Sequence, residues 1–333
     1  NYQGEDDTWT VEYSTDGLSL AITYMDATQG WIPTTDDDVT DAPSKSNQEG
    51  IFGYGEGGDP AGDLSLSNLV SNAGVVSTDV TGVGTIRRML AACEYGGDKG
   101  IFGFGYDNVT GNVSMSNLVS NAGVVATDVT GVGTARYALA ACGYGEDKGI
   151  FGFGYTGSYV GMTNLVSNAG VVATDVTAVG TARMYLAACE YGGDKGIFGF
   201  GSTGSLTAVS NLVSNAGVVA TDVTGVGTAR YGAAACGYGY DKGIFGYGTV
   251  TGGNDGVSMS NLVSNAGVVA TDVTGVGTGR YLLAATQYGG DKGIFGYGYV
   301  SGYSSLTNLV SNAGVVASDV TGVGTVRYAP AAC

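Results

Sequence analysis

Histidine is absent from all 333 residues of this chain. Its absence removes the commonest general base, the Ser-His-Asp and Cys-His nucleophile systems, and every imidazole metal site. Asp, Glu and Tyr chemistry remains open, but in a chain of this length the lack of histidine argues against an enzyme. We therefore expect no catalytic residues, no metal centre and no cofactor.

Basic residues are also scarce, since 13 Lys and Arg oppose 30 Asp and Glu and leave a net charge of −17. Such an acidic surface repels phosphate backbones and anionic lipid heads, so no nucleic-acid partner is expected. No run of eighteen apolar residues predicts a membrane span, and no basic-then-apolar leader is present. The chain begins at Asn1 and not at Met, from which we expect processing or a piece of a longer protein.

The five cysteines are too regularly spaced to form a disulfide framework. They are separated by 49, 47, 47 and 97 residues, and Thr286 divides the last interval in the same register. Equivalent positions of separate repeat units seldom lie within the ~4.4–6.8 Å that a disulfide needs between Cα atoms. The spacing indicates one repeat position filled by a small buried apolar side chain, or alternatively a ring of thiols around an axis; the residues are Cys93, Cys142, Cys189, Cys236 and Cys333.

The sequence states one stretch of eighteen residues six times. NLVSNAGVVATDVTGVGT stands at 117–134 and recurs unchanged at 211–228 and 261–278. The copies at 68–85, 164–181 and 308–325 differ at one position each, namely Ser77, Ala178 and Ser318. A repeat of 47–50 residues indicates a structure built from equivalent units.

Each unit contains four short runs typical of β-strands. In one copy these are Tyr137–Tyr144, Lys148–Tyr155, Thr163–Ser167 and Val171–Val176. Alternation in the second run predicts that its two phenylalanines share one face while its glycines let the next sheet pack closely. Four strands at this period predict the blades of a β-propeller.

The chain ends predict how such a ring closes. The aromatic-glycine run occurs six times, first near residue 50, and the chain ends on a first strand, Arg327–Cys333, that has no second strand after it. Pairing this strand with the run near residue 50 closes six blades and hides two sheet edges. An open solenoid, or a fibre joined end to end by the same exchange, is the alternative.

The order of arginine, small apolar strand, aromatic-glycine strand, variable loop and hairpin resembles the kelch repeat of β-propellers. The chain departs from kelch proteins because it lacks a glycine doublet in every unit and a repeated tryptophan. Units such as RYALAACGYGEDKGIFGFG also resemble those of structural proteins of marine tailed bacteriophages, and residues 9–35 resemble the β-rich ends of phage fibre shafts. The resemblance implies a virion or extracellular setting.

The predicted organisation is therefore a β-rich shaft or connector segment at 1–35, an acidic polar linker at 36–49, and an all-β, six-bladed, kelch-like propeller at 50–333. The N-terminal segment is expected to bind other virion proteins or copies of the same chain. In the linker, Asp36, Asp37, Asp38 and Asp41 suit Ca²⁺ by their oxygen content but lack the spacing of an EF-hand loop, so a plain solvated linker is the other interpretation.

Two sets of charged residues repeat with the units and are predicted to tie blades together by charge-assisted hydrogen bonds. A sialidase-like arginine site is disfavoured because all six arginines share one register and no Asp-box motif is present. The predicted sets are Arg88, Arg136, Arg183, Arg230, Arg280 and Arg327, with Asp79, Asp128, Asp175, Asp222, Asp272 and Asp319.

Length variation is confined to the loop between the second and third strands of each unit. Tyr, Ser, Asn and Gly in these loops suit an adaptable recognition surface, although ordinary drift of surface loops is the alternative. The candidate ligand-binding residues are Asp107, Asn108, Asn112, Tyr155, Tyr159, Asn254, Asp255, Tyr299 and Tyr303. They predict a non-enzymatic tail fibre or similar appendage that attaches to a host-surface glycan or protein; a structural virion part such as a capsid decoration or head fibre, a cellular lectin-like adhesin, and a glycan-cleaving propeller are the alternatives.

Overall fold

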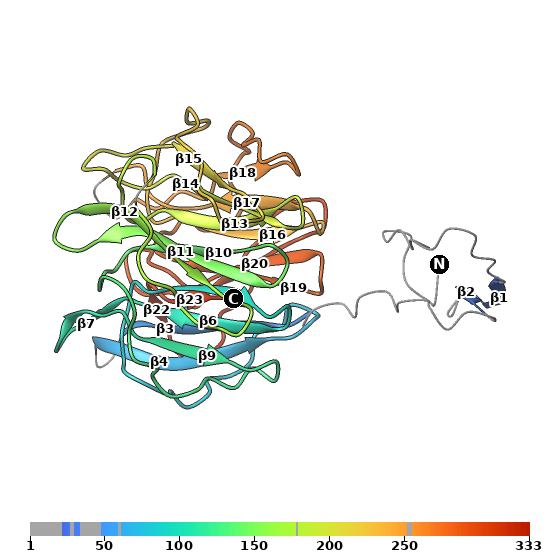
Figure 1. Ribbon diagram of the computed structural model, residues 1–333, viewed down its shortest axis with the longest axis horizontal. Helices are drawn as coiled ribbons and strands as arrows, with labels where there is room; N and C mark the ends of the chain where they lie inside the picture. The colour runs from blue at the N-terminus through green and yellow to red at the C-terminus, as the bar shows by residue number, and fades with distance from the viewer. Residues whose placement is uncertain (1–21, 27–29, 34–47, 59–60, 178, 252–254) are drawn as a thin grey trace. The chain divides into compact units, whose positions relative to one another are not determined.

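The computed structural model describes residues 22–26, 30–33, 48–58, 61–177, 179–251 and 255–333 (Figure 1). The chain divides into two compact units, Asn1–Ser46 and Asn47–Cys333. In the first unit, β1 (Ile22–Asp26) pairs antiparallel with β2 (Gly30–Pro33). The linker aspartates considered for Ca²⁺ and the candidate Asn254 lie outside the described residues. None of the described segments is a helix, so no described helix could span a membrane.

The second unit is all-β and consists of six small antiparallel sheets. The first sheet contains β3 (Gly50–Gly58), β4 (Ala61–Val70), β22 (Arg327–Tyr328) and β23 (Ala331–Ala332). The second to sixth sheets each have three strands in chain order. These are β5 (Ala91–Tyr95), β6 (Lys99–Gly103) and β9 (Ser116–Val119); β10 (Ala140–Tyr144), β11 (Lys148–Tyr155) and β12 (Tyr159–Val166); β13 (Ala187–Tyr191), β14 (Lys195–Gly199) and β15 (Ser210–Val213); β16 (Ala234–Tyr238), β17 (Lys242–Gly246) and β18 (Ser260–Val263); and β19 (Ala284–Tyr288), β20 (Lys292–Gly296) and β21 (Thr307–Val310). A further hairpin, β7 (Tyr106–Asp107) and β8 (Gly111–Asn112), follows β6.

The fourth run of each unit does not form a regular strand, contrary to the sequence prediction. In the third sheet it is joined to β12 by two isolated bridges, Val166 with Val172 and Thr163 with Val176. Between these bridges the Asn164 side chain enters the ladder, because its Nδ2 donates to Ala173 O and to Asp175 Oδ1, both at 2.9 Å. A side-chain amide thus replaces backbone hydrogen bonds that a continuous strand would make.

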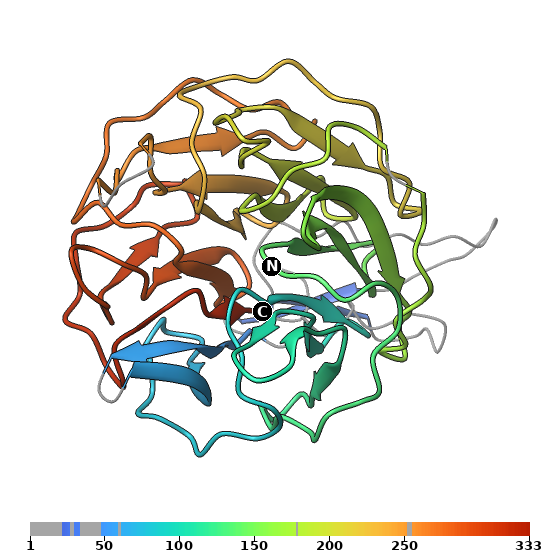
Figure 2. The ribbon, with the colours of Figure 1, turned by 90° about the vertical axis from the view of Figure 1, so that its left-hand side faces the viewer.

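The end of the chain pairs with the beginning of the second unit, as the sequence predicts. β22 and β23 both run antiparallel to β3, with Arg327 opposite Gly57 and Ala331 opposite Gly53. The first sheet is therefore assembled from strands almost a whole chain apart. Figure 2 shows the six sheets following one another around a common axis.

Six backbone hydrogen bonds run between neighbouring sheets and return to their starting point. Each donor precedes or interrupts the innermost strand of its own sheet and donates to the equivalent residue of the sheet before it, with N···O distances of 2.7–3.1 Å. All six residues have φ between 50° and 64°. In order they are Met89, Ala138, Tyr185, Gly232, Leu282 and Ala329. The N–H of Ala329 donates to the carbonyl of Leu282, and the N–H of Met89 donates to the carbonyl of Ala329, which completes the cycle.

Glycine and phenylalanine make the close contact between successive sheets. A Cβ at Gly152 of the third sheet would lie only 2.7 Å from Cζ of Phe198 in the fourth. The same pairing occurs at all six interfaces, and Phe52 closes the cycle against Gly296. Between each pair of neighbouring sheets lies one apolar core, as expected for glycine faces that admit the next sheet.

The two phenylalanines of β11 lie on opposite faces, so the prediction of a shared face is wrong. Phe151 contacts Phe104 of the second sheet and Phe153 contacts Phe198 of the fourth, both with ring centroids 5.2 Å apart. Phe153 has φ of 63°, and the register between β11 and β12 shifts between Gly152 and Gly154. This irregularity breaks the period-two alternation, which allows one strand to supply aromatic rings to two cores.

All five cysteines are free thiols, and four of them are buried while Cys333 is partly buried. Each sulfur packs over a glycine of the following sheet, as Cys93 does over Gly149. Burial raises the pKa of Cys93 well above its ordinary value, so the thiol is unreactive. The cysteines fill space as predicted, and together with Thr286 they also surround an axial cavity.

Candidate functional site

The variable loops lie at the end of each sheet where its innermost strand begins. Tyr137, which precedes β10, is bridged to Tyr155 at the end of β11, and Tyr281 is bridged in the same way to Tyr299. This end of the second unit is called the loop face below. The structure thereby places the candidate loops beside residues that the sequence had assigned to the innermost strands.

Tyrosine rings form two connected groups on the loop face. Rings in contact have centroids 5.2–6.4 Å apart, mostly edge to face, within the range in which aromatic pairs attract. All ten rings are partly exposed. One group contains Tyr106, Tyr137, Tyr155 and Tyr159, and the other Tyr185, Tyr231, Tyr281, Tyr299, Tyr303 and Tyr328.

Four of the nine candidates belong to these groups. Tyr155 and Tyr159 contact each other at 5.4 Å, and Tyr299 and Tyr303 at 5.9 Å. The loop comparison missed the other six tyrosines because most of them stand in the repeated strand. A signal was present, since tyrosine directly follows the repeated arginine in four units, at Tyr137, Tyr231, Tyr281 and Tyr328.

A charged cluster joins the first, second and sixth sheets on this face. Arg88 Nη1 lies 2.7 Å from Asp63 Oδ1 and 2.9 Å from Glu56 Oε2. Tyr303 and Tyr328 donate their hydroxyls to the two oxygens of Glu56 at 2.8 and 3.1 Å, and their rings are stacked at 5.2 Å. The hydrogen bond to Glu56 raises the pKa of Tyr303 to about 12, so the phenol remains a neutral donor at physiological pH.

Three of the remaining described candidates belong to the β7–β8 hairpin. Asp107 is buried and shapes its turn, because its carboxylate accepts hydrogen bonds from Val109 N at 2.9 Å and Thr110 Oγ1 at 2.7 Å. Asn108 is exposed while its backbone N–H donates to Asp63, and Asn112 is partly exposed opposite Tyr106. Asp255 is exposed on a different sheet's loop. Among the described candidates, only the tyrosines therefore belong to the connected groups of rings.

The repeated arginine of the first complete unit is Arg87, so the assignment of Arg88 to this set is wrong. Arg87 Nε donates to Phe104 O at 2.9 Å and Nη2 to Asn117 Oδ1 at 2.6 Å, as Arg136 does to Phe153 O and Asn164 Oδ1. The spacing in the sequence also identifies Arg87, because it stands six residues before Cys93, as Arg136 stands six residues before Cys142. The side-chain contacts agree, because only Arg87 is fully buried.

The arginine and aspartate sets hold each sheet together and also connect it to its neighbour. Arg136 is fully buried and lies 3.8 Å from Asp175 within its own unit, whereas its guanidinium covers the Phe104 ring of the preceding sheet at 4.2 Å. Burial lowers the pKa of Arg136 to about 10. For Asp175, burial opposes ionisation, but hydrogen bonds from Thr134 and Asn164 outweigh it and lower the pKa. The link between sheets is thus the cation–π contact.

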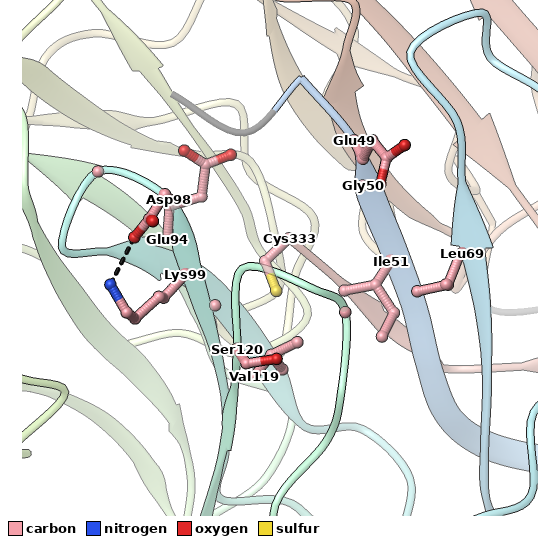
Figure 3. Close-up of a pocket in the computed structure, with 13 residues that line it drawn as sticks. Glu49, Gly50, Ile51, Leu69, Glu94, Asp98, Lys99, Val119, Ser120 and Cys333 are labelled. Atoms are coloured by element: carbon pink, nitrogen blue, oxygen red, sulfur yellow. Dashed lines mark hydrogen bonds and ion pairs between the residues drawn. The ribbon is translucent and has the colours of Figure 1, made fainter. Parts of the chain in front are cut away.

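Three small cavities lie in the second unit. One opens at the axis on the loop face among Met89, Tyr185 and Leu282, and one lies among the cysteines farther along the axis. Figure 3 shows the third, which lies between the first and second sheets beside the Lys99–Asp98 ion pair. They leave about 70, 60 and 30 Å³ for solvent, which suits a few water molecules and not a sugar ring.

Two glutamates and a glutamine extend from alternate innermost strands into the axial cavity that the cysteines line. Glu94, Glu190 and Gln287 follow the cysteine position, and Gly143 and Gly237 occupy the strands between them. A Cβ at Gly143 would overlap the Glu190 carboxyl group, so glycine is needed there. Burial raises the pKa of both glutamates, and the charge of Glu94 raises that of Glu190 further. Among the described residues, no three His, Cys, Asp or Glu side chains are arranged to hold a metal ion.

Comparison with known proteins adds no assignment to this geometry, because no family model matches the chain and no curated protein shows significant similarity to it.

Proposed function

We propose that residues 50–333 form a closed, kelch-like, six-bladed β-propeller and that the protein is a non-enzymatic virion appendage, such as a tail fibre. The cyclic order of the six sheets and the pairing of β22 and β23 with β3 support the propeller. The resemblance to phage structural proteins supports the extracellular, virion setting. The N-terminal segment then serves as the attachment to other virion proteins or to copies of the same chain.

In this proposal the loop face binds a glycan or protein on the host surface. The observation that carries it is the two groups of tyrosine rings, which lie where the units differ in loop length. Partly exposed tyrosines supply rigid apolar area together with a hydroxyl, at low cost in conformational entropy. Glu56 adds a partly exposed acceptor, and Arg88 adds a guanidinium held by Glu56 and by the buried Asp63. A shallow surface of this kind suits an extended chain of sugars better than a single small molecule.

The test is binding to a glycan array and to host cells by the full chain and three variants. Tyr155→Ala with Tyr299→Ala interrupts both tyrosine groups and should abolish binding, whereas the corresponding Phe substitutions should retain most of it if ring stacking dominates. Tyr240→Ala is the matched control, since this exposed tyrosine lies in a turn at the opposite end of its sheet. Equal binding by the double Ala variant and the control would refute a role of the loop face.

A structural role in the particle, such as capsid decoration, is the second candidate function. The observation that favours it is a set of six nearly identical, partly exposed segments at the outer edges of the sheets, which differ only at Ser77 and Ser318. Electron microscopy of the particle would distinguish the two, because a purely structural part would have its loop face covered by other subunits.

A further inference from the structure

Each sheet has at its outer edge a nearly identical six-residue segment, here called a rim strip. The rim strips are Val75–Val80, Val124–Val129, Val171–Val176, Val218–Val223, Val268–Val273 and Val315–Val320, and they differ only at Ser77 and Ser318. The first valine of each strip is 64–65% exposed and the last is 44–46% exposed. The valine next to the first one is buried in five strips and partly buried at Val316. The strip is thus anchored by one valine and presents two others to solvent.

Both exposed valines of the strip are the same in all six units. Some buried positions vary between units, as at Leu139 and Ala233, but others are invariant, as at Phe151 and Val166. Invariance alone therefore does not distinguish the exposed valines. They differ from the buried Val166 because each leaves apolar surface in solvent at the edge of its sheet.

The rim strips are unprotected sheet edges. Among the described residues, no further strand pairs with their outer side. Natural sheet edges that must stay single are commonly blocked by lysine or proline, and the strips contain neither. Their sole charged residue is the aspartate, and in the third sheet Asp175 is held by Thr134, Asn164 and Arg136. The strips are therefore apolar, nearly neutral patches on a protein with a net charge of −17.

We propose that the rim strip is a self-association surface, which docks against a rim strip of a second copy of this chain. Two acidic molecules repel each other over most of their surface and can approach most closely where the charge is neutralised. Identical edges pair around a two-fold axis, with each strip contacting the same strip of its partner. Because the strips recur in every sheet around the axis, one molecule can bind several neighbours side by side and build a planar array.

A single strip is short, so one contact buries less than the ~1,200 Å² of a stable complex and is weak alone. Several equal contacts per molecule make the array cooperative, so that association should rise steeply with concentration. This surface is distinct from the loop face and from the N-terminal segment. An array formed through the rim would leave the loop faces accessible and present many of them together.

The test is sedimentation velocity of the full chain over a range of concentrations, with negative-stain microscopy of the assembled fraction. The first variant carries Val→Thr at the first valine of all six strips, which keeps the shape and the β-branch but removes the apolar surface. The second carries the change at Val75, Val171 and Val268 alone. The matched control is Ile86→Thr, Val109→Thr and Val326→Thr, three exposed apolar residues outside the strips.

We expect the wild-type chain and the control to associate into planar arrays, the three-strip variant to give only small oligomers, and the six-strip variant to stay monomeric with an unchanged circular dichroism spectrum. If six changes prevent folding, the three-strip variant decides. Association of the strip variants equal to that of wild type would overturn the proposal and would assign any assembly to the N-terminal segment. A wild-type chain that stays monomeric at all concentrations would overturn it as well. The affinity of a single loop face for glycan should be unchanged in a strip monomer, although the avidity of the array is lost, which separates this result from failure of the loop-face proposal.

Discussion

The contact between glycine and phenylalanine at the sheet interfaces makes a strong quantitative prediction, tested by Gly152→Ala. The new Cβ would lie 2.7 Å from Cζ of Phe198, a ring that is fully buried. Carbon atoms pack best at about 3.5–4.0 Å, so the ring or the neighbouring sheet must move by roughly 0.8 Å. In a closed cycle of sheets, one interface cannot widen without disturbing the others.

Overpacking of this kind costs about 1–3 kcal/mol of unfolding free energy. Gly62→Ala is the matched control, because a Cβ there meets no atom within 4 Å. At such an open site the substitution mainly reduces the entropy of the unfolded chain and should be neutral or stabilising by up to about 1 kcal/mol. The two variants should therefore differ by roughly 1–4 kcal/mol although both add one methyl group.

The assay is the urea midpoint, monitored by tyrosine fluorescence and by circular dichroism to verify that both probes report one transition. Thermal unfolding should show the same order, with a loss of roughly 2–4 °C for each kcal/mol. Equal stability of Gly152→Ala and Gly62→Ala would refute the argument that glycine is required by the approach of Phe198. A reduced midpoint for both would point to backbone conformation and not to the interface.

Three further predictions concern buried charge. Arg136→Met should lower the unfolding free energy by about 3–5 kcal/mol, because it leaves buried acceptors and a carboxylate without their partner. In urea titrations Arg87→Met should lose the same unfolding free energy, since Arg87 is the equivalent residue. The pKa of Asp175 is lowered in the folded protein, so its ionised form stabilises the fold above the ordinary Asp pKa of about 3.9, and this stability is lost as the pH falls through the lower folded pKa. In the Asp175→Asn variant the urea midpoint should therefore fall less steeply with decreasing pH than in wild type. The raised pKa of Glu190 has the opposite sign, so wild type should lose stability as the pH rises above the ordinary Glu pKa of about 4.3. Glu190→Gln should then be more stable than wild type at about pH 9 and show no such advantage at about pH 4, and an unchanged difference between these pH values would contradict the assignment.

Much of the fold could be predicted because its determinants are local and repeated. The 47–50 residue period, the glycine-marked turns and the unpaired first strand at the chain end predicted six small sheets and the pairing of Arg327–Cys333 with the run near residue 50. Gly170 adopts the left-handed conformation, with φ of 74°, that the hairpin after β12 needs. Six equivalent copies made each of these inferences stronger than a single copy would.

The errors arose where one irregular residue changes a simple alternation. Phe153 adopts a left-handed φ that no residue type announces, and this places Phe151 and Phe153 in different cores. The Asn164 side chain interrupts the outer strand for a similar reason, since a polar side chain can replace the backbone as a partner. Period-two reasoning assumes that neither event occurs.

The candidate site was less accessible to sequence reasoning because it depends on contacts between sheets. The loop comparison found Tyr155, Tyr159, Tyr299 and Tyr303, but it missed the strand tyrosines that complete the surface. The spacing to Cys93 identifies Arg87 as the repeated arginine, but nothing in the sequence shows that the adjacent Arg88 binds Asp63 on the loop face.

The sequence by itself thus determined the repeated unit, its strand content, its turns and its means of closure, because residues close along the chain set these features. Tertiary structure alone decided which rings meet, which partners Arg88 binds, and which valines of the repeated segment face solvent. These depend on the position of the adjacent sheet, and that sheet is brought into contact only when the six units are arranged around their axis.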